Sequence, residues 1–206
     1  MLVVELMNIH LKDEDFRQAG VKAVCALASL SAHLRDDLGK VGACKILMDI
    51  LAKPVPNALL LEICEAIMHL TLNPSNTDRF ASLGCCELLL TPAISTPMLD
   101  LDFGPEILTG CLLNMSTYGL TAINNRLRLV KAQVGKLLAR TRFCVKASFR
   151  AREQVSILGD LLGVDLGGVA GPGAGVGGMG GVIHGSEMKG DTVPLQVELR
   201  EEVVLD

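Results

Sequence analysis

A recurring pattern of leucines and small residues constrains the fold of this chain more than any other feature. The stretch LRDDLGKVGACKILMDIL (residues 34–51) is followed 42 residues later by NTDRFASLGCCELLLTPAI (76–94), and NRLRLVKAQVGKLLAR (125–140) fits the same template. Each copy has an apolar residue, a small-residue turn and then a leucine: Leu38, Phe80 or Leu129 before the turn, and Leu47, Leu89 or Leu138 after it. Recurrence at a fixed spacing is typical of a structural unit used several times.

The turn in this template predicts where one short helix ends and the next begins. It holds Gly42 in the first copy and Gly84 in the second, but Gln133 in the third. Glycine reaches positive φ at little cost, so it permits a steep angle between two helices. Gln133 weakens the third match.

A longer amphipathic segment also recurs beside each copy. AVCALASLS (23–31), ICEAIMHLT (63–71), LTGCLLNMS (108–116) and EQVSILGDLL (153–162) carry apolar residues three and four apart, which a helix places on one face. Their alignment pairs Ser29, His69, Asn114 and Asp160, at separations of 40, 45 and 46 residues. A period of about 40 to 47 residues with two or three helices per unit is typical of helical solenoids.

Composition supports helices. Half of the 206 residues are apolar, but only six are aromatic: five Phe, one Tyr and no Trp. Strand-rich domains usually contain more aromatic residues than this. We therefore predict an all-α fold. The seven cysteines fall mostly within apolar helical patterns and have no C-x-x-C spacing, which predicts reduced core residues of a cytoplasmic or nuclear protein: Cys25, Cys44, Cys64, Cys85, Cys86, Cys111 and Cys144.

The order of these motifs resembles the armadillo repeat. NTDRFASLG matches the family's opening motif, GACKILMDIL its glycine turn and second helix, and CLLNMS the end of its third helix. The resemblance covers roughly residues 2–162. It implies a right-handed α-solenoid of about three repeats over residues 1–162. The start, MLVVELM, aligns inside a second helix, so we expect a fragment of a longer array that self-associates through this uncapped apolar helix.

The armadillo resemblance also implies a function: a non-catalytic scaffold that binds a protein or an extended peptide in a concave groove lined by third helices. In the family an asparagine of the third helix hydrogen-bonds the peptide backbone, and only Asn114 matches it. Ser29, His69 and Asp160 occupy the aligned positions, and Glu65 stands one turn before His69. A purely structural role for Asn114, in packing or capping, stays open.

One ligand class of the family is disfavoured. The tryptophan that nuclear-import adaptors carry one turn earlier is replaced by Cys25, Glu65, Gly110 and Ser156. Without that ring, recognition of basic localisation signals by cation–π stacking is not expected.

Charge is divided along the chain. Residues 107–152 carry nine basic and no acidic residues, whereas the segments on either side are acidic. The nine basic residues are Arg126, Arg128, Lys131, Lys136, Arg140, Arg142, Lys146, Arg150 and Arg152. They could form a patch that binds nucleic acid or an anionic membrane surface, which is the alternative function, or they could simply be a solvated surface. The chain's own acidic terminus is another candidate partner for them.

Enzymatic signals are weak, so we predict no catalytic site, cofactor or metal. The four histidines are far apart in the chain, and we expect no acidic or cysteine ligands beside them at metal spacing. GAGVGG (173–178) formally satisfies G-x-G-x-x-G, but no helix-forming run follows it, which a dinucleotide site requires. No apolar run reaches the roughly 18 residues that span a bilayer, and the start lacks the features of a signal peptide.

The last quarter of the chain has a different composition. Residues 163–190 include 12 glycines, and we expect a Gly-rich disordered linker over residues 163–191. An acidic segment follows over residues 192–206, with no clear secondary structure preference.

Overall fold

The computed structural model describes residues 2–10 and 12–166, and these residues fold into helices without a strand. The all-α prediction is therefore confirmed for this part of the chain. The predicted disordered linker and acidic terminal segment lie outside the described residues, apart from residues 163–166. The helices are α1 (Leu2–Ile9), α2 (Glu14–Leu30), α3 (Ala32–Lys40), α4 (Ala43–Leu51), α5 (Asn57–Leu70), α6 (Pro74–Ser82), α7 (Cys85–Leu89), α8 (Pro92–Asp100), α9 (Gly104–Thr117), α10 (Ala122–Lys131), α11 (Val134–Phe143) and α12 (Phe149–Leu162).

Short helices occur in pairs where the template predicts them. The pairs are α3 and α4, α6 and α7, and α10 and α11, each joined through one residue in the left-handed conformation. That residue is Gly42 (φ 93°), Gly84 (φ 81°) or Gln133 (φ 61°). Gln133 therefore adopts the backbone of the two glycines, despite the strain that a side chain meets there.

The apolar positions of the template form the centre of these helix pairs. All six have 0% exposed surface: Leu38, Phe80 and Leu129 before the turn, and Leu47, Leu89 and Leu138 after it. Full burial of such a side chain stabilises the fold by about 1.5–3 kcal/mol. The recurring leucines are thus explained by packing.

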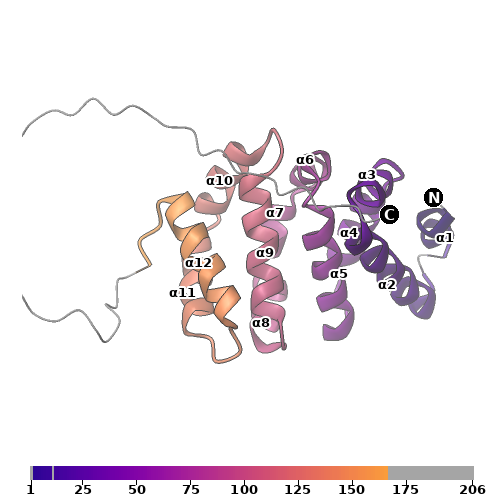
Figure 1. Ribbon diagram of the computed structural model, residues 1–206. Helices are drawn as coiled ribbons and strands as arrows, with labels where there is room; N and C mark the ends of the chain where they lie inside the picture. The colour runs from indigo at the N-terminus through magenta and orange to yellow at the C-terminus, as the bar shows by residue number, and fades with distance from the viewer. Residues whose placement is uncertain (1, 11, 167–206) are drawn as a thin grey trace, which may run out of the picture. The chain divides into compact units, whose positions relative to one another are not determined.

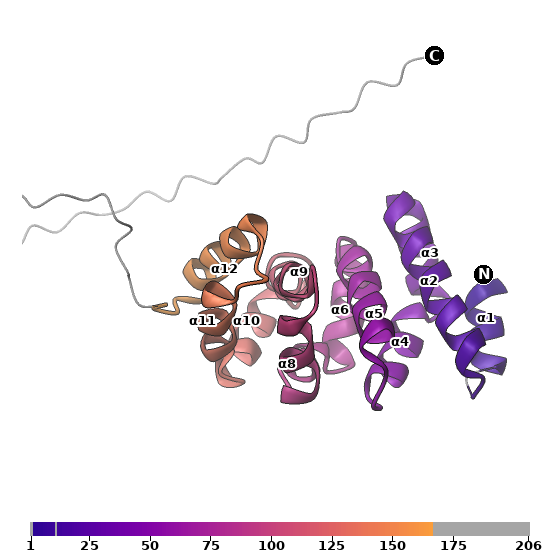
Figure 2. The ribbon, with the colours of Figure 1, turned by 90° about the horizontal axis from the view of Figure 1, so that it is seen from below.

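The four longer helices stack in chain order. Helix α2 packs against α5, α5 against α9, and α9 against α12, as both views show (Figures 1 and 2). Their facing sides are apolar and buried, with Ile63 and Ile67 on α5, Leu108 on α9, and Val155 and Leu158 on α12. The segments predicted to be amphipathic helices are therefore neighbours in space.

One hydrogen bond recurs where a short helix follows a long one. The residue three positions before Leu38, Phe80 and Leu129 donates in each case to a backbone carbonyl near the end of the preceding long helix. The bonds run from Arg35 Nε to Ala28 O, from Thr77 Oγ1 to Thr71 O, and from Arg126 Nε to Ser116 O, each at 2.8 Å. A carbonyl without a partner in the last turn of a helix is satisfied in this way.

Helix α8 has no counterpart in the sequence template. It begins with Pro92, whose fixed φ suits the first turn of a helix, and it packs against α5, α7 and α9. It lies between the short α7 and the long α9, a place that holds no helix in the other two units of the described region.

Candidate functional site

The predicted groove residues lie on the four stacked helices. Ser29 is on α2, His69 on α5, Asn114 on α9 and Asp160 on α12. Ser29 and Asp160 are exposed, whereas His69 and Asn114 are half-buried. The hydroxyl of Ser29 donates to the carbonyl of Ala26 in its own helix, at 2.8 Å.

Aligned positions on α2 and α5 are also spatial neighbours. Lys22 Nζ lies 3.4 Å from Glu62 Oε1, and these residues are 40 apart, the same separation as Ser29 and His69. The register deduced from sequence therefore matches the contact register of these two helices.

Three half-buried side chains meet between α2 and α5. The Cys25 thiol, the Glu65 carboxylate and the His69 imidazole have ligand atoms that all lie within 4.8 Å of one another. Burial, together with the negative charges of Glu65 and Glu62, raises the pKa of the Cys25 thiol to about 12. Burial also lowers the pKa of His69, against the opposing effect of Glu65.

This cluster corrects one step of the sequence interpretation. His69 does have an acidic neighbour at a useful spacing, because Glu65 lies four residues earlier on the same helix, with Oε1 3.9 Å from His69 Nε2. The E-x-x-x-H spacing was the available signal. Cys25 could not be placed beside the pair without the stacking of α2 on α5.

Asn114 makes contacts within the helix stack. Its Nδ2 donates to Met68 O at 2.9 Å and lies 3.2 Å from Thr71 Oγ1, both at the end of α5. These bonds use the amide donors to join α9 to α5, so the structural role left open by the sequence has direct geometric support.

Several residues of the basic segment have partners within the protein. Arg128 pairs with Glu87 through two hydrogen bonds, Nε to Oε1 at 2.5 Å and Nη2 to Oε2 at 2.6 Å, and its Nη1 donates to Ala81 O. The other bonds are Arg126 Nε to Ser116 O at 2.8 Å, Lys146 Nζ to Asp102 Oδ1 at 3.1 Å and Arg150 Nη1 to Glu106 Oε1 at 3.4 Å. The ion pairs of Arg128, Lys146 and Arg150 lower the net positive charge that the segment presents to a phosphate ligand.

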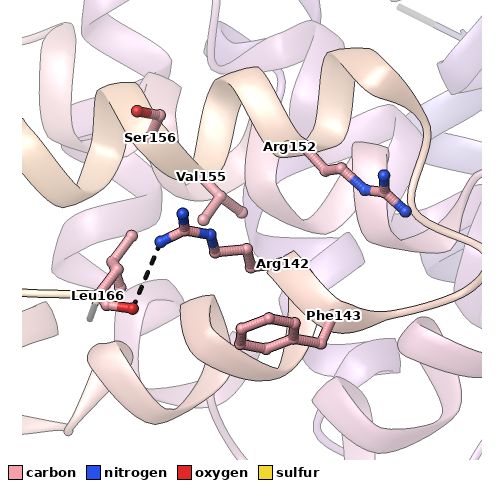
Figure 3. A pocket seen from close by; sticks show the side chains of 6 residues that line it. All are labelled: Arg142, Phe143, Arg152, Val155, Ser156 and Leu166. Atoms are coloured by element: carbon pink, nitrogen blue, oxygen red, sulfur yellow. Dashed lines mark hydrogen bonds between the residues drawn. The ribbon is translucent and has the colours of Figure 1, made fainter. Parts of the chain in front are cut away.

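The remaining basic residues are spread over three helices, α10, α11 and α12. Lys131, Lys136 and Arg140 are exposed at the end of α10 and on α11. Arg142 and Arg152 line a pocket of about 390 Å³ together with Phe143, Val155, Ser156 and Leu166 (Figure 3). Arg142 Nη1 lies 3.4 Å from Leu166 O, while the Arg152 guanidinium points away from that of Arg142 (Figure 3). The two arginines therefore do not converge on one anion.

The cysteines of the helical region are free thiols. Cys85 and Cys86, the vicinal pair, are both 0% exposed, and burial raises the pKa of Cys86 to about 12. Such thiols are poorly ionised and shielded from solvent, as expected for packing residues.

Among residues 2–10 and 12–166, no helix is both long enough and apolar enough to cross a membrane.

In comparisons with known proteins, no family model, curated protein or solved structure matches the chain. We therefore infer the function from the arrangement of the side chains in the structure.

Proposed function

We propose that residues 1–162 form an armadillo-like right-handed α-solenoid that serves as a non-catalytic scaffold. Its ligand is an extended peptide segment of a protein partner, bound along α2, α5, α9 and α12. The observation that carries this proposal is the stacking of these four helices in chain order, with Lys22 and Glu62 in contact at aligned positions.

Such a stack presents equivalent positions at regular intervals, which suits a ligand that is itself extended. Exposed polar side chains occur at both ends of the series, with Ser29 on α2 and Asp160 on α12. Glu65 and His69 supply hydrogen-bonding groups on α5, and both are half-buried. Asn114 acts differently in this proposal: it holds α9 against α5 and so sets the spacing of the surface.

The test uses the full chain and a library of random peptides displayed on phage. Selected peptides are resynthesised with a photoreactive residue and cross-linked to the protein. The proposal requires cross-links on α2, α5, α9 or α12 and a loss of affinity of at least tenfold on Ser29→Lys or Asp160→Lys.

Ser82 provides a matched control for Ser29. Both are exposed serines near a helix end, and each hydroxyl donates to the carbonyl three residues earlier, at 2.8 Å for Ser29 and 2.7 Å for Ser82. Ser82 is on α6, away from the proposed surface, so Ser82→Lys should leave affinity unchanged. Equal losses from both lysines, or cross-links confined to α4, α7 and α11, would contradict the proposal.

Salt dependence separates this function from the alternative of phosphate binding by residues 126–152. Affinity for a nucleic acid falls by about 0.9 log units per neutralised phosphate for each log unit of salt. A peptide held mainly through its backbone should lose much less. Tight, strongly salt-dependent binding of duplex DNA or RNA together with failure of the peptide selection would favour the alternative.

A further inference from the structure

Three side chains with metal-binding chemistry meet where α2 packs against α5. Cys25 comes from α2, while Glu65 and His69 lie one turn apart on α5. Their sulfur, oxygen and nitrogen ligand atoms all lie within 4.8 Å of one another, and Glu65 Oε1 is 3.9 Å from His69 Nε2. We propose that Cys25, Glu65 and His69 bind a divalent transition-metal ion, and that the ion is zinc.

The ligand types favour zinc over the harder cations. Thiolate and imidazole are the common zinc ligands and a carboxylate oxygen is also accepted, whereas magnesium and calcium prefer oxygen ligands alone. Three protein ligands would leave one tetrahedral position for water or for a group of a bound partner.

The geometry needs only a small adjustment. Zinc bonds of about 2.0–2.3 Å in a tetrahedron place ligand atoms about 3.3–3.6 Å apart. Metal binding would therefore draw the ligand atoms together by about 1 Å from their present upper limit of 4.8 Å. Cys25 and Glu65 are both only half-buried, so rotation about their side-chain bonds can supply this movement.

Charge around the cluster also favours a cation. Glu62 lies near Cys25, and its Oε2 is buried without a hydrogen-bond partner among the described residues. The nearby positive groups are Lys22, which contacts Glu62 Oε1, and Arg35, whose charge acts on His69. A divalent ion would offset the negative charge of the carboxylates of Glu62 and Glu65.

The site does not depend on the peptide-binding proposal, and a metal-binding measurement tests it separately. The full chain, reduced with a phosphine and freed of metal by a chelator, is titrated with cobalt(II). We expect one equivalent to bind, with the near-ultraviolet charge-transfer band of a cobalt–thiolate bond. Zinc should displace the cobalt and abolish the band.

Three variants assign the ligands. Cys25→Ser should abolish the charge-transfer band, and Glu65→Gln and His69→Gln should each weaken zinc binding at least tenfold in competition with a chromogenic chelator. Circular dichroism checks that each variant keeps its helical content. His69→Gln keeps the test decisive if Cys25→Ser does not fold.

Two matched controls are available. His33 and Asp37 form the same histidine–carboxylate pair four residues apart, with Nε2 3.4 Å from Oδ2, but within the described part of the chain they belong to no such cluster with a thiol. Cys144 is the other half-buried cysteine of the helical region. His33→Gln and Cys144→Ser should leave both the band and the zinc affinity unchanged. Absence of a thiolate band in the unmodified protein, or zinc affinity that is unaltered in both Cys25→Ser and His69→Gln, would overturn the proposal.

Discussion

Asn114 Nδ2 donates a hydrogen bond to the carbonyl oxygen of Met68, 2.9 Å away on the neighbouring helix. The two residues are 46 positions apart, so this bond joins α9 to α5 across the stack. The sequence suggested that the Asn114 amide would hydrogen-bond the backbone of a bound peptide. In the structure it hydrogen-bonds the backbone of its own protein.

Replacement of Asn114 should therefore affect stability. Asn114→Ala removes the bonds to Met68 and Thr71, and we expect a loss of about 1 kcal/mol in the free energy of unfolding. The loss is not larger because Met68 O also accepts from Thr71 Oγ1 at 3.0 Å. Urea denaturation followed by circular dichroism measures the change. Thr117→Ala, which removes an exposed bond within α9, is the control and should change stability by less than about 0.5 kcal/mol.

Of the three recurring hydrogen bonds from a short helix to the long helix before it, the bond donated by Thr77 is the fully buried one. The Thr77 hydroxyl donates to Thr71 O at 2.8 Å, and both residues are 0% exposed. Thr77→Val keeps the shape but leaves the carbonyl of Thr71 without this donor, which should cost about 1–3 kcal/mol. Thr77→Ser retains the hydroxyl and should recover most of the hydrogen-bond contribution. Equal unfolding free energies for Thr77→Val and the unmodified protein would show that this bond contributes nothing.

Substitutions at two of the left-handed turn residues should change the free energy of unfolding in opposite directions. Gly84→Ala places a Cβ at φ 81° with no atom within 4 Å to clash with, so its cost of about 1–2 kcal/mol comes from the backbone alone. Gln133→Gly removes that strain at φ 61° but adds freedom to the unfolded chain, for a net gain of about 0.5–1 kcal/mol. Thermal or urea unfolding of the two variants checks both signs. A destabilised Gln133→Gly would mean that the glutamine side chain makes a compensating contribution.

The pairing of Glu87 with Arg128 predicts a pH dependence. Burial alone would raise the pKa of Glu87, but hydrogen bonds from Arg128 and the backbone, with the attraction of Arg128, lower it overall. A lowered pKa in the folded state stabilises the protein above the ordinary glutamic acid value of about 4.3, and this contribution is lost as the pH falls through the folded value. Both side chains are partly exposed, so we expect less than about 1 kcal/mol.

A comparison of unfolding free energies between the unmodified protein and Glu87→Gln measures this effect. The difference should be constant from pH 7 to about 5 and shrink below about pH 4.3. Asp49, which pairs with Lys45 on the exposed side of α4, provides a second surface ion pair for comparison through Asp49→Asn. A difference for Glu87→Gln that does not change with pH would exclude the carboxylate as its source.

The apolar pattern predicted the helix pairs well because burial leaves a direct mark on sequence. Leu38, Phe80 and Leu129 recur at one place in the template, and all three are fully buried. Gln133 shows the limit of turn signals. The helices on either side of Gln133 carry the fully buried Leu129 and Leu138, as in the glycine copies, and this packing holds a glutamine in a backbone conformation that its own preference would not select.

Features that depend on contacts between distant segments could not be predicted. Helix α8 follows a five-residue helix and contains two prolines, Pro92 and Pro97, and the sequence template has no place for it. The sequence alignment placed Cys25 and Glu65 at equivalent positions, but only the packing of α2 against α5 shows that their side chains meet that of His69. Asn114 matches a family motif, yet its amide points into the stack, because Met68 O and Thr71 Oγ1 lie within its reach.

The recurring bond from each short helix to the long helix before it bears on how such a chain diverges. Its donors are a guanidinium at Arg35, a hydroxyl at Thr77 and a guanidinium at Arg126, while its acceptor is always a main-chain oxygen. Every residue type carries that oxygen, so mutation cannot remove it, and any donor of suitable length serves. The units can therefore keep the same three-dimensional structure after their amino-acid sequences have ceased to be similar.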